Sequence, residues 1–151
     1  MGVMPWLVFL LTVLVDQSSK VLVEKILPLQ EPVRVIGSLV QITYIRNPKG
    51  AFGLPLGGKP FFVVFSVLAS LLILYVLLRM PRQRMWSSVA LTLVLGGAVG
   101  NLIDRLRFGE VIDFIDIGIR NTRWPIFNAA DIAVSAGVAL LVYALVFGKE
   151  S

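Results

Sequence analysis

The sequence predicts an all-α membrane protein, a four-transmembrane-helix bundle with a small external β-rich subdomain after the first span. Of its 151 residues, 57% are hydrophobic and 15% are charged, whereas an ordinary soluble domain has about 45–50% and about 25%. Four apolar runs each approach the ~20 residues that a helix needs to cross the hydrocarbon core of a bilayer. A chain this apolar could not cover a soluble core with polar surface, and its length fits one domain.

The apolar runs also predict how the chain crosses the membrane. Spans are expected at about residues 5–23, 60–78, 86–103 and 126–147, with external loops at about 24–59 and 104–125. Arg79, Arg82 and Arg84 crowd the short link between the second and third spans, and dense positive charge in a short loop marks the cytoplasmic side. Because the number of spans is even, we expect both termini to be cytoplasmic.

The first external loop predicts a small sheet. Its stretch EPVRVIGSLVQITYIRN is rich in β-branched side chains, and the pair Gly37-Ser38 divides it into two extended pieces. The loop then ends in NPKGAFGLPLGG.

The composition excludes several kinds of chemistry. The chain contains no cysteine and no histidine, which rules out disulfides, zinc–thiolate sites and histidine-based triads or metal centres. The net charge of +5 comes from scattered basic residues, without the clustered lysines, arginines and aromatic residues of a nucleic-acid interface. Any acid–base chemistry therefore falls to Asp, Glu, Lys or Tyr.

An ionisable side chain at membrane depth is costly and is a candidate for function. In the first span, Asp16 and Lys20 stand four residues apart on one helical face. The simpler interpretation is an ion pair near the interface, with Lys20 snorkelling toward the headgroups.

The third span carries a second polar group near its external end. Asn101 and Asp104 share a helical face, and Arg105 lies beside them. Gly96 and Gly100 precede this group at a spacing that lets another helix approach closely. A packed helix that ends in an interfacial arginine is the structural alternative to a functional site.

In the fourth span, Asn128, Asp131 and Ser135 form a stripe on one face. Beyond Ser135 this face becomes apolar, which places Asp131 about one turn inside the span, on the same external side as Asp104. Asn128 could cap the helix, and the N-terminal dipole would then favour Asp131.

The segment VIDFID, residues 111–116, adds two more carboxylates, Asp113 and Asp116. A helix would place both on one face, whereas a strand would place them on opposite faces. The flanking Gly109 and Gly118 favour an extended or irregular segment, in which only one of the two can face the bundle. Periodicity does not choose between them.

Two carboxylates brought close together share a proton, so that one can act as a base toward water and the other as an acid toward a carbonyl oxygen. Peptide hydrolysis by an aspartic dyad is thus one option that needs no cofactor and no metal. Two alternatives stay open. One is an ion-coupled transporter with a relay of buried charges. The other is a Mg²⁺-dependent lipid-phosphate transferase with Asp113 and Asp116 as ligands.

The pattern GNLIDRLRFGEVIDF followed by FNAADIAVSAG, with DQSSK in the first span, resembles the bacterial lipoprotein signal peptidases (signal peptidase II) over essentially the whole chain. This resemblance implies a single integral membrane peptidase domain that removes signal peptides from lipid-modified prolipoproteins, just before the diacylglyceryl-cysteine. It implies a multi-pass protein of the bacterial inner (cell) membrane, with its active site near the external face. Membrane lipids and precursor signal peptides are the expected partners, nucleic acid is not, and a monomer is expected.

The resemblance also implies roles for particular residues. The catalytic aspartates correspond to Asp113 and Asp131, which leaves Asp116 as a solvated or structural acid. Arg105 and Asn47 resemble the residues that hold the substrate backbone. The supporting residues that the resemblance implies are Asn101, Asp104, Asn128, Asp16 and Lys20. One departure is Lys49, which takes the position of a usual glycine after Asn47.

Overall fold

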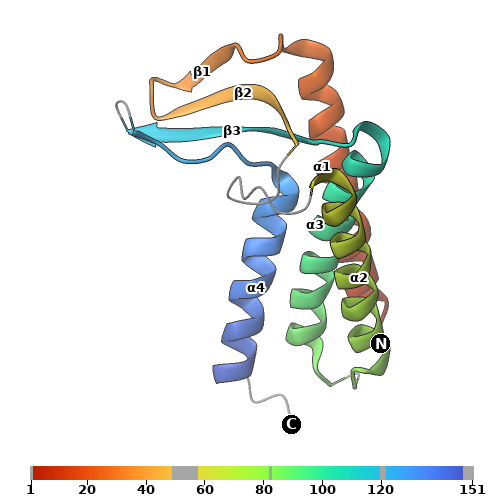
Figure 1. The fold of residues 1–151 in the computed structure, drawn as a ribbon. Coiled ribbons are helices and arrows are strands. Elements are labelled where there is room, and N and C mark those ends of the chain that lie inside the picture. The colour runs from red at the N-terminus through yellow and green to blue at the C-terminus, as the bar shows by residue number, and fades with distance from the viewer. Residues whose placement is uncertain (1, 49–57, 82, 120–121, 148–151) are drawn as a thin grey trace.

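In the computed structural model, which describes residues 2–48, 58–81, 83–119 and 122–147, four long helices form a bundle and a small sheet lies across one end of it (Figure 1). The helices are α1 (Val3–Ile26), α2 (Gly58–Arg79), α3 (Met85–Phe108) and α4 (Ala129–Phe147). All four contain a stretch long and apolar enough to cross a membrane. The predicted fold class is confirmed.

The helix ends differ from the predicted span limits where polar groups find partners inside the protein. α3 runs past Asp104 and Arg105 and ends at Gly109, whose φ of +72° and N–H bond to the Arg105 carbonyl (2.9 Å) close the last turn. α4 begins three residues later than expected, because Phe127 forms a bridge to the sheet and Asn128 caps the helix. The ends of the helices therefore lie in the same region as the candidate site residues.

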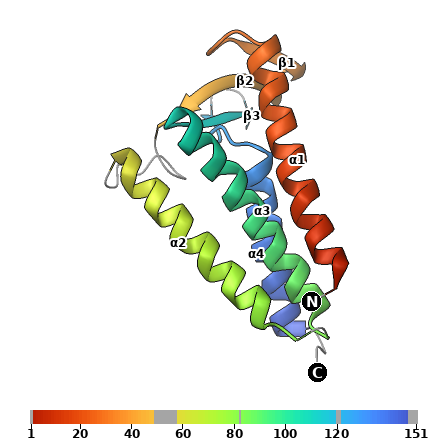
Figure 2. The same cartoon turned by 90° about the vertical axis from the view of Figure 1, so that its right-hand side faces the viewer.

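α3 is the central helix and packs against the other three (Figure 2). Its glycines permit this close approach, as the sequence predicts. A Cβ atom on Gly96 would lie 2.8 Å from the side chain of Thr12, and one on Gly97 would collide with the carbonyl of Ala130. A Cβ atom on Gly100 would collide with the carboxylate of Asp16. The bundle can form with these polar groups in contact only because α3 has no side chains at these positions.

The sheet is antiparallel, with the order β1 (Pro32–Ile36), β2 (Val40–Asn47), β3 (Val111–Ile119) and β4 (Thr122–Arg123). The turn between β1 and β2 falls at Gly37, whose φ is +52°. The predicted sheet after the first span is thus present. The prediction was incomplete, because β3 and β4 come from the loop after the third span and complete the same sheet. A core of Val23, Tyr44, Ile112 and Phe114 joins the sheet to the end of α1.

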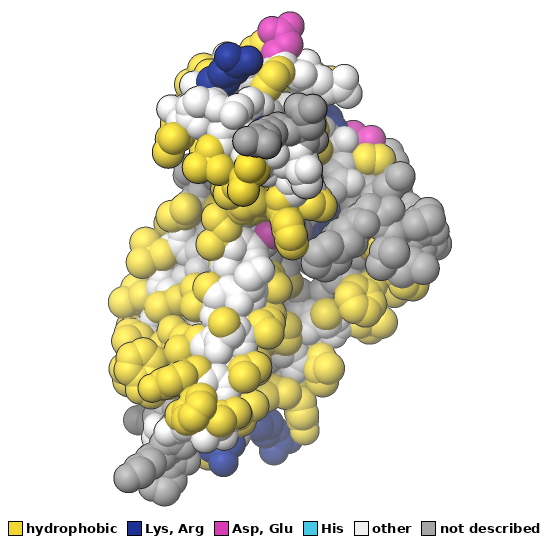
Figure 3. Space-filling view, turned by 90° about the vertical axis from the view of Figure 1, so that its left-hand side faces the viewer, with side chains coloured by type: hydrophobic (Ala, Val, Ile, Leu, Met, Phe, Trp, Pro, Cys, Tyr) yellow, Lys and Arg dark blue, Asp and Glu magenta, His cyan; other side chains and the backbone are white. Residues whose placement is uncertain are grey.

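The outer surface of the helices suits a bilayer. Figure 3 shows apolar side chains over most of the helix length and charged side chains at both ends, among them Lys and Arg at the end away from the sheet. The first residues of α1 and the last residues of α4 lie at this same end (Figure 1). The chain is therefore a multi-pass membrane protein with its sheet at one end.

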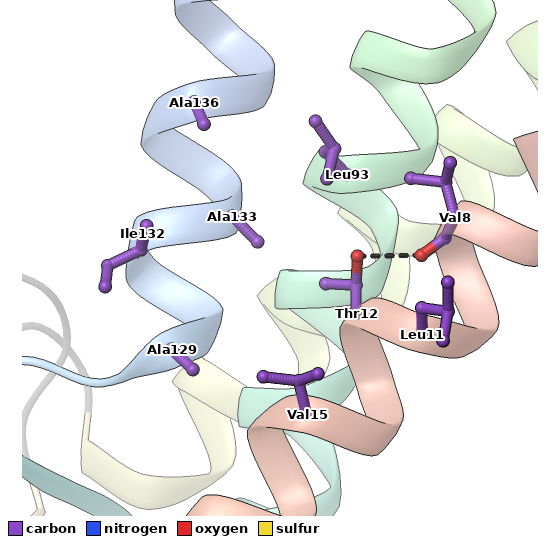
Figure 4. A pocket seen from close by; sticks show the side chains of 9 residues that line it. All are labelled: Val8, Leu11, Thr12, Val15, Leu93, Ala129, Ile132, Ala133 and Ala136. Atoms are coloured by element: carbon purple, nitrogen blue, oxygen red, sulfur yellow. Dashed lines mark hydrogen bonds between the residues drawn. The ribbon is translucent and has the colours of Figure 1, made fainter.

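An apolar groove of about 460 Å³ lies between α1 and α4, and Leu93 of α3 also lines it (Figure 4). Its polar member, Thr12, donates its hydroxyl to the carbonyl of Val8 at 2.8 Å. α4 lines the groove with Ala129, Ile132, Ala133 and Ala136, a stripe on the side of the helix away from Asp131. The groove is thus separate from the polar groups described next.

Candidate active site

The VIDFID segment is part of strand β3, and its two carboxylates face opposite ways. Both are buried, with 2% exposure for Asp113 and 4% for Asp116. Asp116 accepts a hydrogen bond from the Thr43 hydroxyl (3.0 Å) and forms an ion pair with Arg123, which fixes β4 against β3. The interpretation of Asp116 as a structural acid agrees with these contacts. The alternative of a solvated acid is wrong, because the sheet encloses the carboxylate.

Asn128 joins Asp113 to Asp131. Its side-chain Oδ1 accepts the backbone N–H of Asp131 (3.0 Å), and Asp131 Oδ2 accepts the backbone N–H of Asn128 (3.2 Å), a reciprocal cap at the start of α4. The predicted helix cap is therefore present. With its carbonyl oxygen used by the cap, the amide Nδ2 of Asn128 points to β3 and donates to Asp113 Oδ1 at 2.7 Å.

Asn101 of α3 forms a second link. Its Nδ2 donates to Asp131 Oδ1 (3.0 Å), and its Oδ1 accepts from Asn128 Nδ2 (3.0 Å). Both oxygens of Asp131 therefore accept N–H bonds. The same holds for Asp113, whose Oδ2 accepts from Asn47 Nδ2 at 2.9 Å. The three predicted asparagines surround the two carboxylates and hold them with neutral donors.

Burial dominates the electrostatics of Asp113. Loss of water raises its pKa from 3.8 to about 6, even though the amide of Asn47 acts in the opposite direction. The negative charge of Asp131 contributes to the increase, which shows that the two carboxylates are close enough to influence each other. A proton on Asp113 near neutral pH is therefore within reach of the chemistry that an aspartic pair requires.

The expectation that Lys20 snorkels toward the headgroups is wrong. Its side chain is 2% exposed, and its ammonium lies 2.8 Å from Asp16 Oδ2 and 2.8 Å from Asp104 Oδ2. Because α3 supplies a second carboxylate, the lysine is satisfied inside the bundle and need not reach the headgroups. The predicted pair of Asp16 and Lys20 is thus part of a three-charge cluster between α1 and α3.

Arg105 lies on α3 with its guanidinium held loosely. Its Nη1 is 3.4 Å from the hydroxyl of Ser66 on α2 and 3.4 Å from the Asn101 carbonyl. The guanidinium also lies over the ring of Phe62, 5.8 Å from its centroid, and interacts electrostatically with the carboxylates of Asp113 and Asp131. It is a cation beside the two carboxylates, and the described residues use only part of its five N–H donors.

One residue of the site was missed by the sequence reasoning. Gln17 Nε2 lies 3.1 Å from both Asp16 Oδ2 and Asp104 Oδ1, so it bridges the same two carboxylates as the lysine. Gln17 stands about 100° around the helix from Asp16, so it is not on the helical face that Asp16 and Lys20 share. Its polar side chain inside an apolar span was the signal that could have identified it. Lys49, the one departure in the sequence pattern, lies outside the described residues.

The fold and the site together define a multi-pass membrane protein with a pair of carboxylates, one buried on a strand and one half-buried on a helix, at the sheet end of its bundle. Residues 8–147 match the family described as signal peptidase (SPase) II. The chain is 45% identical over 148 residues to the lipoprotein signal peptidase of Syntrophus aciditrophicus (strain SB), covering 91% of each. It is 41% identical over 148 residues to that of Desulforapulum autotrophicum, covering 95% of this chain and 91% of the relative.

A solved structure described as a bacterial membrane enzyme is also similar. The TM-score is 0.87 at 32% sequence identity, covering 94% of this chain and 87% of that one. The chain therefore belongs to the signal peptidase II family and is a membrane peptidase, as the resemblance of its motifs predicts. Membership in a peptidase family argues against both the transporter and the transferase.

Proposed function

We propose that this peptidase is an aspartic endopeptidase that removes signal peptides from lipid-modified prolipoproteins by cutting before the diacylglyceryl-cysteine. Asp113 and Asp131 form its catalytic dyad. One observation carries the proposal: the side chain of Asn128 donates to Asp113 at 2.7 Å while it caps, and is capped by, Asp131. A single buried residue thereby links the carboxylates of two segments, β3 and α4.

The reaction uses one proton shared by the pair. Asp113, whose pKa is raised to about 6, holds the proton, and Asp131 is the ionised base. Asp131 takes a proton from water as the water oxygen attacks the scissile carbonyl carbon, and Asp113 gives its proton to the carbonyl oxygen. The tetrahedral diol then collapses: one of its hydroxyls returns a proton to Asp113, the C–N bond breaks, and the amide nitrogen takes the proton held by Asp131 and leaves as an amine, which restores the dyad.

The neighbouring residues bind and orient in this scheme. Asn101 and Asn128 hold the carboxylates, and Arg105 and Asn47 hold the substrate backbone beside them. The support for Arg105 is that its Nη1 makes only long contacts, at 3.4 Å, with other residues that the structure describes. A guanidinium with spare donors can bind a peptide carbonyl that would otherwise be unpaired in a dry site.

The membrane orientation belongs to the same proposal. The site lies at the sheet end of the bundle and the arginine-rich link lies at the other end; the tendency of positive charge to stay on the cytoplasmic side supports a dyad at the external face of the cell membrane. A signal peptide that spans the bilayer would then present its cleavage site beside the dyad. We propose that the enzyme acts as a monomer.

The test is cleavage of a lipid-modified precursor by purified protein. Asp113→Asn and Asp131→Asn should each abolish turnover, since either change removes one of the two proton-transfer steps. Asp116→Asn is the matched control on the same strand and should keep much of the activity. Wild-type cleavage by either of the first two variants would exclude the dyad. Loss of activity in EDTA that Mg²⁺ restores would instead favour metal-dependent chemistry.

A further inference from the structure

The two segments that carry the aspartates are held in the same way. The backbone N–H of Ile112, one residue before Asp113, donates to Asp104 Oδ2 at 3.1 Å. The backbone N–H of Ala130, one residue before Asp131, donates to Asp16 Oδ1 at 2.9 Å. Each aspartate thus follows a backbone N–H that a buried carboxylate fixes.

Lys20 connects these two carboxylates to each other. Its ammonium lies 2.8 Å from Asp16 Oδ2 and 2.8 Å from Asp104 Oδ2. Its third acceptor is Asn101 Oδ1, at 2.9 Å. An ammonium has three N–H donors, and in Lys20 each has an acceptor on a different residue.

The third bond decides which way the amide of Asn101 faces. Because Asn101 Oδ1 accepts from the ammonium, its Nδ2 must point away from Lys20, and it donates to Asp131. A flipped amide would put an N–H group against the ammonium and an oxygen against the Asp131 carboxylate, two repulsive contacts in a low-dielectric site.

We propose that Lys20 is a positioning residue for the dyad, which acts by joining the carboxylates of Asp16 and Asp104 and by fixing the amide of Asn101. This inference rests on the proposed function and assigns the lysine a role beyond the neutralisation of buried charge. The lysine sets the distance between Asp113 and Asp131, and it ensures that the Nδ2 group of Asn101 faces Asp131. The charged groups that interact with it are Asp16 on α1, Asp104 on α3, Asp113 on β3 and Asp131 on α4.

The first test is Lys20→Met, which keeps the length of the side chain and removes its charge and donors. We expect kcat for the lipid-modified precursor to fall by about 10²-fold, the cost of misplacing catalytic groups by about an ångström, while KM changes less than threefold. The positive charge of Lys20 also lowers the pKa of Asp113. The limb of kcat/KM that Asp113 sets should therefore move to higher pH in this variant because the charge is lost, and the fall in kcat at nearly constant KM is the readout that a merely structural role would not produce.

Arg123→Met is the matched control. It leaves the buried carboxylate of Asp116 without its cation, as the first variant does to Asp16 and Asp104. We expect a lower melting temperature from both variants, but kcat within threefold of wild type and an unmoved pH limb from Arg123→Met. Equal effects of the two variants on kcat and on the pH limb would overturn the positioning role, and so would kcat within threefold of wild type for Lys20→Met.

If Lys20→Met does not fold, Asn101→Leu is the test. It keeps the three charges of Asp16, Lys20 and Asp104 and removes only the amide that the lysine orients. It should lower kcat at least tenfold with KM within threefold, and an unchanged kcat would overturn the inference. Asp113→Asn and Asp131→Asn are measured in the same assay. If they retain activity, the proposed function fails whatever the lysine does. If they are inactive while Lys20→Met keeps its kcat, only the positioning role fails.

Discussion

Asp113→Asn is expected to make the protein more stable at neutral pH while it abolishes activity. The carboxylate of Asp113 is 2% exposed, and burial raises its pKa from 3.8 to about 6. An acid whose pKa is higher in the folded than in the unfolded state disfavours folding once both states ionise. This cost is absent below pH 3.8, grows between pH 3.8 and 6, and is fully present above pH 6.

The magnitude follows from the shift. A difference of 6 − 3.8 = 2.2 pKa units corresponds to about 3 kcal/mol at 1.36 kcal/mol per unit. An asparagine never ionises, so the variant avoids this cost. It loses one acceptor for the donors of Asn47 and Asn128, which offsets about 1 kcal/mol. The net gain is about 2 kcal/mol at pH 8, or about 4–8 °C in melting temperature for a chain of this size.

The assay is thermal unfolding in detergent, followed by tryptophan fluorescence at pH 8 and at pH 3.5. At pH 3.5 the gain should vanish and leave the variant slightly less stable than wild type. Asp116→Asn is the control with the opposite sign: it breaks the buried pair with Arg123 and should lower stability at pH 8 by about 1.5–3 kcal/mol. A folded Asp113→Asn protein that melts at or below the wild-type temperature at pH 8 would refute the reasoning.

Two further predictions concern the pH profile and the helix packing. The value of kcat/KM, which reports the free enzyme, should fall as pH rises through about 6, because Asp113 then loses the proton that the dyad shares; a profile that stays flat to pH 8 would contradict this assignment. Gly97→Ala should separate α3 from α4, because the new Cβ would collide with the carbonyl of Ala130, at a cost of about 1–3 kcal/mol. The control Gly2→Ala meets no atom within 4 Å and should melt like wild type.

Most of the fold could be predicted from the sequence, because its determinants are local. Apolar length indicated four helices, and the glycine spacing of α3 indicated where another helix approaches. The pairing of β3 with β2 was not predictable in this way, since it joins Gln41 to Asp116 across two transmembrane helices. The sheet that the first loop predicts therefore lacked half of its strands.

In the site too, contacts between residues close in the sequence were predictable and contacts between distant residues were not. The cap of α4 by Asn128 followed from the sequence, because a cap involves residues three apart. The burial of Lys20 did not, because it depends on Asp104, a residue far along the chain. With only Asp16 as a partner, a lysine near the end of a span would be expected to reach for water.

The chain contains the pattern Asn-x-x-Asp twice, at Asn101–Asp104 and at Asn128–Asp131, and the two copies are used differently because of where they fall in their helices. At the start of α4 the backbone N–H groups are free, so Asn128 and Asp131 cap each other and Asp131 remains beside β3. Near the end of α3 the N–H groups are already bonded within the helix. Asp104 therefore reaches outward to the N–H of Ile112 and to Lys20. One pattern thus supplies a reacting carboxylate in the proposed dyad and the other a carboxylate that holds the opposite strand.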